Sequence, residues 1–103
     1  MNDKVSIVIW NDRTRPHVVW IEPWGGDVTL LPKQRLTIST TGPNSTNPAT
    51  FTLTEDEYNT QVYVETFSFP ELLLEGTPVK EGHNRQAAID AGVYIDSDNY
   101  MGR

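Results

Sequence analysis

Three tryptophans and two acidic residues lie close together near the start of this 103-residue chain. Glu22 and Asp27 flank Trp24, and Trp10 and Trp20 come shortly before them. An exposed indole ring can stack against a sugar ring or a partner protein, and a carboxylate beside it can accept hydrogen bonds from hydroxyl groups. We therefore predict a ligand-binding site formed by Trp10, Glu22, Trp24 and Asp27. The alternative is that Trp20 fills the core and Trp24 covers one end of it.

Three consecutive acidic residues, Glu55, Asp56 and Glu57, form a second candidate site. Ten of the fourteen acidic residues lie after residue 51, whereas three of the eight basic residues do. Such a surface repels the phosphates of nucleic acids, so nucleic-acid binding is disfavoured. A basic partner protein would be attracted, and we predict that Glu55, Asp56 and Glu57 contact one. The alternative is that the acidic charge only keeps the domain in solution.

The residue types that metal sites and catalytic sites need do not occur in the required patterns. Two histidines that are two residues apart on a strand can share a metal ion, because their side chains lie on one face. Val19 follows His17 at that spacing, and His83 is remote in the sequence. Asp96 and Asp98 begin like a calcium-binding loop, but its glycine and final glutamate are missing. The chain also lacks cysteine and the motifs of serine hydrolases and phosphate-binding loops, so we predict no metal, no cofactor and no enzymatic activity.

The composition is typical of one small globular domain. Hydrophobic residues make up 37% of the chain and charged residues 21%, with a net charge of −6. The N-terminus has no signal-peptide pattern, and no apolar run reaches the roughly 18 residues that a membrane span needs. We therefore expect a cytoplasmic protein that does not enter a membrane.

Short β-prone segments, separated by turn-forming residues, must position these candidate sites. They lie at residues 5–10, 17–21, 28–31, 35–40, 50–54 and 61–69, with a hairpin at 72–80. This spacing predicts an all-β fold, either a small antiparallel sandwich or a cupin-like barrel of about seven or eight short strands. If the first two strands pair, Trp10 and Trp20 are near neighbours. A strand left at an edge, such as residues 50–54, could pair across a dimer.

Apolar residues at every second position indicate which side chains face the core. Leu36 and Ile38 alternate with polar residues in one segment, and Phe51 and Leu53 do so in another. Such alternation is typical of a sheet with one buried face, so all four are expected to point inward.

The C-terminal part of the chain has a different character. Residues 84–91 favour a short helix, with Asn84 as a candidate cap and Gly92 as a candidate stop. A helix this short is marginal in water and forms only if it docks on the sheet. We predict one domain, in which residues 1–82 form the β core and residues 83–103 form a helix and tail packed on it or frayed from it.

Glu22-Pro23-Trp24-Gly25 follows an apolar strand and precedes Leu30-Leu31-Pro32. This arrangement resembles a motif of short bacterial proteins of unknown function, in which a strand ends in Glu-Pro-Trp-Gly. Glu75-Gly76 stands where that group has a late Asp-Gly hairpin. The resemblance implies a cupin-like or jelly-roll β-barrel and brings no established activity.

These patterns favour a non-enzymatic binding or protein-interaction module that docks on a basic partner. Carbohydrate or small-ligand binding at a tryptophan-lined barrel mouth is the alternative. A degenerate cupin-type enzyme is a third hypothesis.

Overall fold

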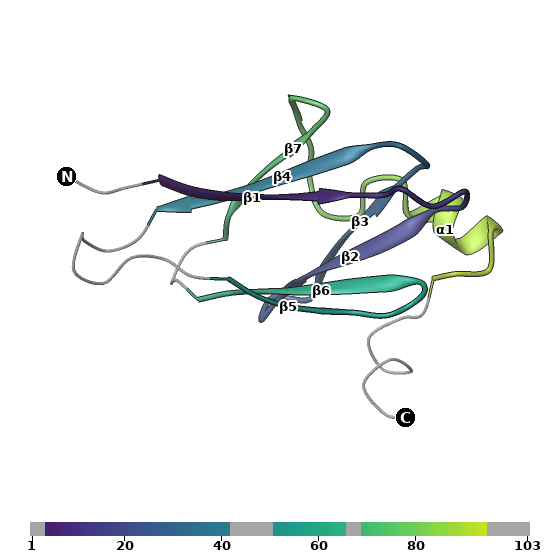
Figure 1. Cartoon of the computed structure of the whole chain (residues 1–103), viewed down its shortest axis with the longest axis horizontal. Helices are drawn as coiled ribbons and strands as arrows, with labels where there is room; N and C mark the ends of the chain where they lie inside the picture. Colours follow the sequence, from purple (N-terminus) through teal and green to yellow (C-terminus); the bar gives the residue numbers. More distant parts are fainter. Residues whose placement is uncertain (1–3, 42–50, 66–68, 95–103) are drawn as a thin grey trace.

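A computed structural model describes residues 4–41, 51–65 and 69–94 of the chain. The elements in these residues are β1 (Lys4–Trp10), β2 (His17–Glu22), β3 (Gly26–Leu30), β4 (Arg35–Thr41), β5 (Phe51–Glu55), β6 (Asn59–Val64), β7 (Glu71–Leu74), β8 (Thr77–Pro78) and α1 (Arg85–Asp90). The structure confirms the all-β class and the short C-terminal helix (Figure 1). The strand expected at 61–69 ends earlier, at Val64, and residues 66–68 lie outside the described residues.

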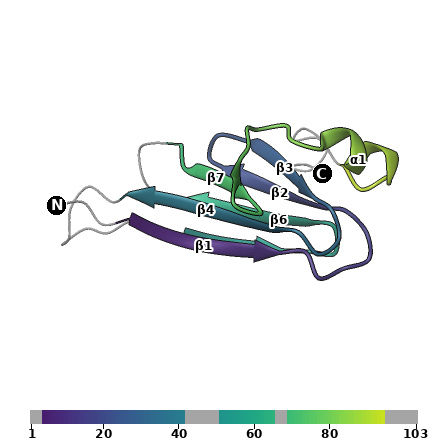
Figure 2. The same cartoon turned by 90° about the horizontal axis from the view of Figure 1, so that it is seen from above.

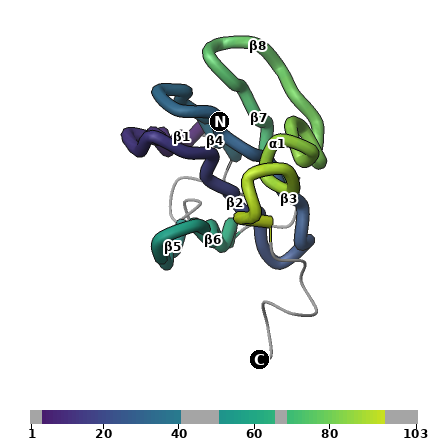
Figure 3. The backbone as a smooth tube through the Cα atoms, turned by 90° about the vertical axis from the view of Figure 1, so that its right-hand side faces the viewer, coloured from purple at the N-terminus to yellow at the C-terminus, as the bar shows by residue number. Residues whose placement is uncertain are grey.

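The eight strands form two four-stranded sheets that face each other as a sandwich. One sheet has the order β1-β4-β7-β8, and the other has the order β3-β2-β6-β5. Figure 3 shows β1 and β5 at one side of the sandwich, and β3 with the β7–β8 hairpin at the other. The first two strands belong to different sheets, so Trp10 and Trp20 do not face each other across a strand pair. One pairing also differs from the antiparallel expectation, because β2 and β6 run parallel.

Ten buried apolar side chains fill the space between the two sheets. They are Val19, Ile21, Val28, Leu30, Leu36, Ile38, Val62, Val64, Leu72 and Leu74. Burying one such side chain fully contributes about 1.5–3 kcal/mol, so this cluster is the main source of stability. Leu36 and Ile38 point inward as predicted, and Phe51 packs against the cluster.

Leu53 departs from the prediction that it is buried. It pairs directly with the buried Val62, so it lies on the face of β5 that is turned toward the core. It is nevertheless 46% exposed, because β5 is the last strand of its sheet within the described residues. Alternation therefore predicted the correct face, but it could not predict whether anything covers that face.

Strand β2 is buried on both faces. Val19 and Ile21 belong to the core between the sheets, whereas Val18 and Trp20 face outward and pack against Ala88 and the segment after α1. This explains why β2 reads as a continuous apolar run and does not alternate with polar residues. The helix therefore docks on the outer face of the β2 sheet, as expected of a helix too short to form alone.

The two ends of α1 differ from each other in how well the sequence predicted them. Gly92 has a φ of 74°, and the N–H of Val93 donates to the carbonyl of Ala88, which is the hydrogen bond of a Schellman stop. Asn84 is the N-cap residue, as predicted, but its side chain makes no capping hydrogen bond. Asn84 instead adopts a left-handed backbone conformation with a φ of 59°.

Candidate functional site

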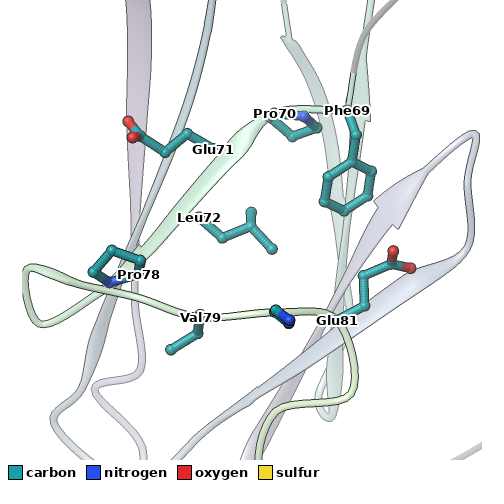
Figure 4. Close-up of a pocket in the computed structure, with 8 residues that line it drawn as sticks. Phe69, Pro70, Glu71, Leu72, Pro78, Val79 and Glu81 are labelled. Atoms are coloured by element: carbon teal, nitrogen blue, oxygen red, sulfur yellow. The ribbon is translucent and has the colours of Figure 1, made fainter.

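A pocket of about 530 Å³ lies on the side of the sandwich that holds the β7–β8 hairpin. Its lining comes from Phe69, Pro70, Glu71, Leu72, Pro78, Val79, Lys80 and Glu81. Figure 4 shows the Phe69 ring and the Leu72 side chain extending toward the space between β7 and the segment after β8. A volume of this size and a mainly apolar floor fit a small organic ligand.

Trp24 lies against one wall of this pocket. The Trp24 and Phe69 rings meet edge to face, with their centroids 5.2 Å apart and their planes at 70°. Trp24 sits in the turn after β2 and is 38% exposed, so part of its indole is open to solvent. Of the four predicted ligand residues, Trp24 is therefore the one that an aromatic contact links to the pocket.

Glu81 is exposed and places a carboxylate at the pocket margin, next to the first residue of β3. A Cβ atom added to Gly26 would lie 2.5 Å from Oε1 of Glu81, so the missing side chain of Gly26 leaves the space that Glu81 occupies. Within the described residues Glu81 forms no salt bridge. The other lining glutamate, Glu71, differs because Lys4 Nζ lies 2.9 Å from its Oε1 atom.

Asp27 has a structural partner, in contrast to Glu81. Its side chain is buried, and it accepts hydrogen bonds of 2.6 and 3.1 Å from the guanidinium of Arg85. The hydrogen bond and the charge of Asp27 raise the pKa of Arg85. This pair ties α1 to β3 on the outer face of the sheet, and it occupies both carboxylate oxygens of Asp27.

Trp10 and Trp24 are not brought together. Trp10 ends β1, next to the loop that leads into β2, whereas Trp24 follows the last residue of β2. The six residues of β2 span about 20 Å, and the two indoles lie at its opposite ends. Trp10 is 49% exposed, and the centroid of its ring lies 5.6 Å from the guanidinium carbon of Arg35. Glu22 is half-buried at the end of β2, near the turn that carries Trp24.

The three acidic residues of the second candidate site make contacts within the chain. Asp56 accepts hydrogen bonds from the backbone N–H groups of two residues that follow it, at 2.9 and 2.8 Å, and so closes the β5–β6 hairpin. Glu55 pairs with Arg13, and Oε2 of Glu57 lies 3.0 Å from Nη2 of Arg15. The loop between β1 and β2 thus supplies two cations that neutralise much of this acidic turn.

His17 is the most perturbed titratable group of the described residues. It is fully buried, and its Nε2 atom lies 2.7 Å from the hydroxyl of Thr60. Desolvation, with a smaller effect of the Arg13 charge, lowers the pKa of His17 to about 4. No group of three or more histidine, aspartate or glutamate side chains gathers in the described ranges in a way that could hold a metal ion, and Asp96 and Asp98 lie outside them.

Sequence reasoning missed Phe69, Leu72 and Glu81 as site residues. Phe69 was assigned to the last position of a long strand, and Glu81 follows a hairpin at no recognisable spacing from Trp24. Two consecutive glycines, Gly25 and Gly26, were the available signal, because glycine permits the close approach of another chain segment.

Comparison with known proteins gives no further assignment. No protein-family model, no curated protein and no solved structure matches the chain significantly. Within the described residues, no helix is both long enough and apolar enough to cross a membrane. The function must therefore be argued from the geometry of the pocket.

Proposed function

We propose that this protein is a non-enzymatic binding module whose site is the pocket beside Trp24 and Phe69. Its ligand is a small organic molecule with an apolar body and a cationic group. The observation that carries this proposal is an apolar pocket with the carboxylate of Glu81 at its margin, which forms no salt bridge in the part of the chain that the structure describes. Phe69, Leu72 and Val79 offer apolar contact to the body of the ligand, and Glu81 offers a counter-charge.

The charges around the pocket favour a cation over an anion. The carboxylate of Glu81 lies next to the backbone of Gly26, at the margin of the pocket. Lys80 also lines the pocket, but its ammonium group sits on a long flexible stem that readily extends into water. Glu71 has its own cation in Lys4, which leaves Glu81 as the carboxylate best placed for a ligand.

The acidic turn is a weaker basis for docking a basic partner. The carboxylates of Glu55, Asp56 and Glu57 all have partners within the chain. Asp56 cannot leave its two backbone donors without opening the hairpin. A basic partner would first have to displace Arg13 and Arg15.

Intrinsic tryptophan fluorescence tests the proposal directly. We expect alkylammonium and arylammonium compounds to change the emission, and neutral alcohols of the same shape to do so more weakly. The response should disappear in Trp24→Phe and persist in Trp10→Phe, the same substitution at the other exposed indole. A response to sugars that exceeds the response to ammonium compounds would support the carbohydrate alternative instead.

Calorimetry of two matched glutamate variants tests the role of the counter-charge. Glu81→Gln should weaken binding of the ammonium ligand about fivefold, because an exposed ion pair contributes about 1 kcal/mol. Glu71→Gln removes a lining carboxylate that is already paired with Lys4, and it should leave the affinity nearly unchanged. Equal losses in the two variants, or no binding of any compound at millimolar concentration, would reject the proposal.

A further inference from the structure

The β1 side of the sandwich leaves apolar side chains partly uncovered. Val5, Ile7 and Ile9 alternate along β1 on the face turned toward the core, yet each remains half-buried. Leu53 of β5 is 46% exposed on the same side of the molecule. Figure 2 shows β1 along the outer margin of its sheet. These residues would be buried if a further layer of protein covered this side.

The outer edge of β1 offers a row of backbone groups that no described strand pairs with. β1 has seven residues, and β4 is its partner strand within the described residues. Soluble proteins commonly protect such an edge with a proline, a bulge, a short strand or an inward-pointing charge. β1 contains no proline or glycine, and its single charged residue, Lys4, stands at its first position. The edge is therefore a suitable template for another strand.

The sequence of β1 is complementary to itself in one antiparallel register. When Ile7 lies opposite Ile7 of a second copy, all seven residues are paired. On the core-facing side, Val5 then lies opposite Ile9, and apolar contact continues from one copy to the next. On the outer side, Lys4 lies opposite Trp10, and Ser6 lies opposite Val8. No like charges oppose each other in this register.

We propose that the chain forms a homodimer in which β1 pairs with β1 of a second copy across a two-fold axis at Ile7. The β1-β4-β7-β8 sheets of the two copies then join into one continuous sheet of eight strands. The same rotation brings the two β5 edges toward each other, which covers Leu53. The pocket lies at the opposite side of the sandwich, and Lys4 of β1 reaches it through its ion pair with the lining residue Glu71.

Cysteine cross-linking tests the register, because the natural chain contains no cysteine. Directly opposed residues of antiparallel strands have Cα atoms about 4.5–5.5 Å apart, which is within disulfide range. Ile7→Cys should therefore give a cross-linked dimer under mild oxidation. Val5→Cys is the matched control, since the two copies of residue 5 would be offset by four positions, or about 13 Å. Similar cross-linking of the two variants, or preferential cross-linking of Val5→Cys, would overturn the register.

Mass measurement in solution tests the dimer itself. Sedimentation of the unmodified chain should give twice the 11.6 kDa of one chain. Ile7→Lys and Ile7→Glu should each be monomeric, because like charges meet at the axis, and an equimolar mixture should recover the dimer. Circular dichroism confirms that each variant is folded. A monomeric mass for the folded unmodified chain at millimolar concentration would overturn the proposal.

Discussion

Acidification should destabilise the fold through one buried side chain, His17. Burial lowers the pKa of His17 from 6.5 to about 4, and the charges of Arg13 and Arg15 act in the same direction. The carboxylates of Glu55 and Asp56 oppose this effect without reversing it. The folded state therefore holds His17 neutral at pH values where the unfolded chain already binds a proton.

The size of the effect follows from the difference between the two pKa values. The stability that depends on neutral His17 is fully present above pH 6.5, where His17 is neutral in both the folded and the unfolded state. Between pH 6.5 and pH 4 the unfolded chain binds one proton more, so the free energy of unfolding falls by up to about 1.4 kcal/mol per pH unit. The total loss is about 3 kcal/mol, a large part of the 5–15 kcal/mol typical of a small domain. Below pH 4 both states are protonated, and this contribution to the slope ends.

Urea unfolding at a series of pH values between 4 and 7 measures this slope. His17→Gln keeps a polar group opposite Thr60 but cannot titrate, so its stability should depend less on pH than that of the unmodified protein. His83→Gln, at the other histidine of the chain, is the matched control. Parallel stability curves for the unmodified protein and His17→Gln would refute the reasoning, because carboxylates would then account for all of the acid sensitivity.

Three further substitutions test contacts elsewhere in the fold. Arg85→Met should lower the free energy of unfolding by about 1–3 kcal/mol in urea titrations, because it leaves the buried Asp27 carboxylate without a counter-charge. The double variant with Asp27→Asn should recover part of that loss. Gly92→Ala should cost about 1 kcal/mol and lower the thermal midpoint by several degrees, since an L side chain is strained at a φ of 74°. Glu57→Gln should change the stability by less than about 1 kcal/mol in the same assay, because its pair with Arg15 is exposed to solvent.

Local patterns in the sequence predicted the faces of the strands but not their neighbours. Leu36 and Ile38 are buried because alternate residues of a strand point to the same side, and this depends on nearby positions alone. Gly92 ends α1 for an equally local reason, since glycine adopts the left-handed conformation easily. The parallel pairing of β2 with β6 depends on a connection through the other sheet, which no short pattern encodes.

The candidate site was harder to predict, because its parts are far apart in the sequence. Trp24 meets Phe69, and Gly26 makes room for Glu81. In both cases the second residue follows the first by more than forty positions in the sequence. Asp27 was predicted to bind a ligand, but Arg85, 58 positions later, binds its carboxylate. The charge of a residue indicates that it needs a partner, but long-range packing decides whether that partner belongs to the chain or to a ligand.

The two sides of the sandwich differ in how their edge strands are protected, and this difference separates the two proposed sites. On the β3 side, the N–H of Gly82 donates to the carbonyl of Asp27 at 2.6 Å, and the N–H of Thr29 donates to the carbonyl of His83 at 3.0 Å. This segment blocks strand addition at β3, and its preceding residues form one wall of the pocket. No described residue protects the outer edge of β1 in this way. A variant that breaks the dimer at Ile7 should therefore leave the affinity for the ammonium ligand unchanged, because Ile7 does not line the pocket and the pair of Lys4 with the lining residue Glu71 is retained.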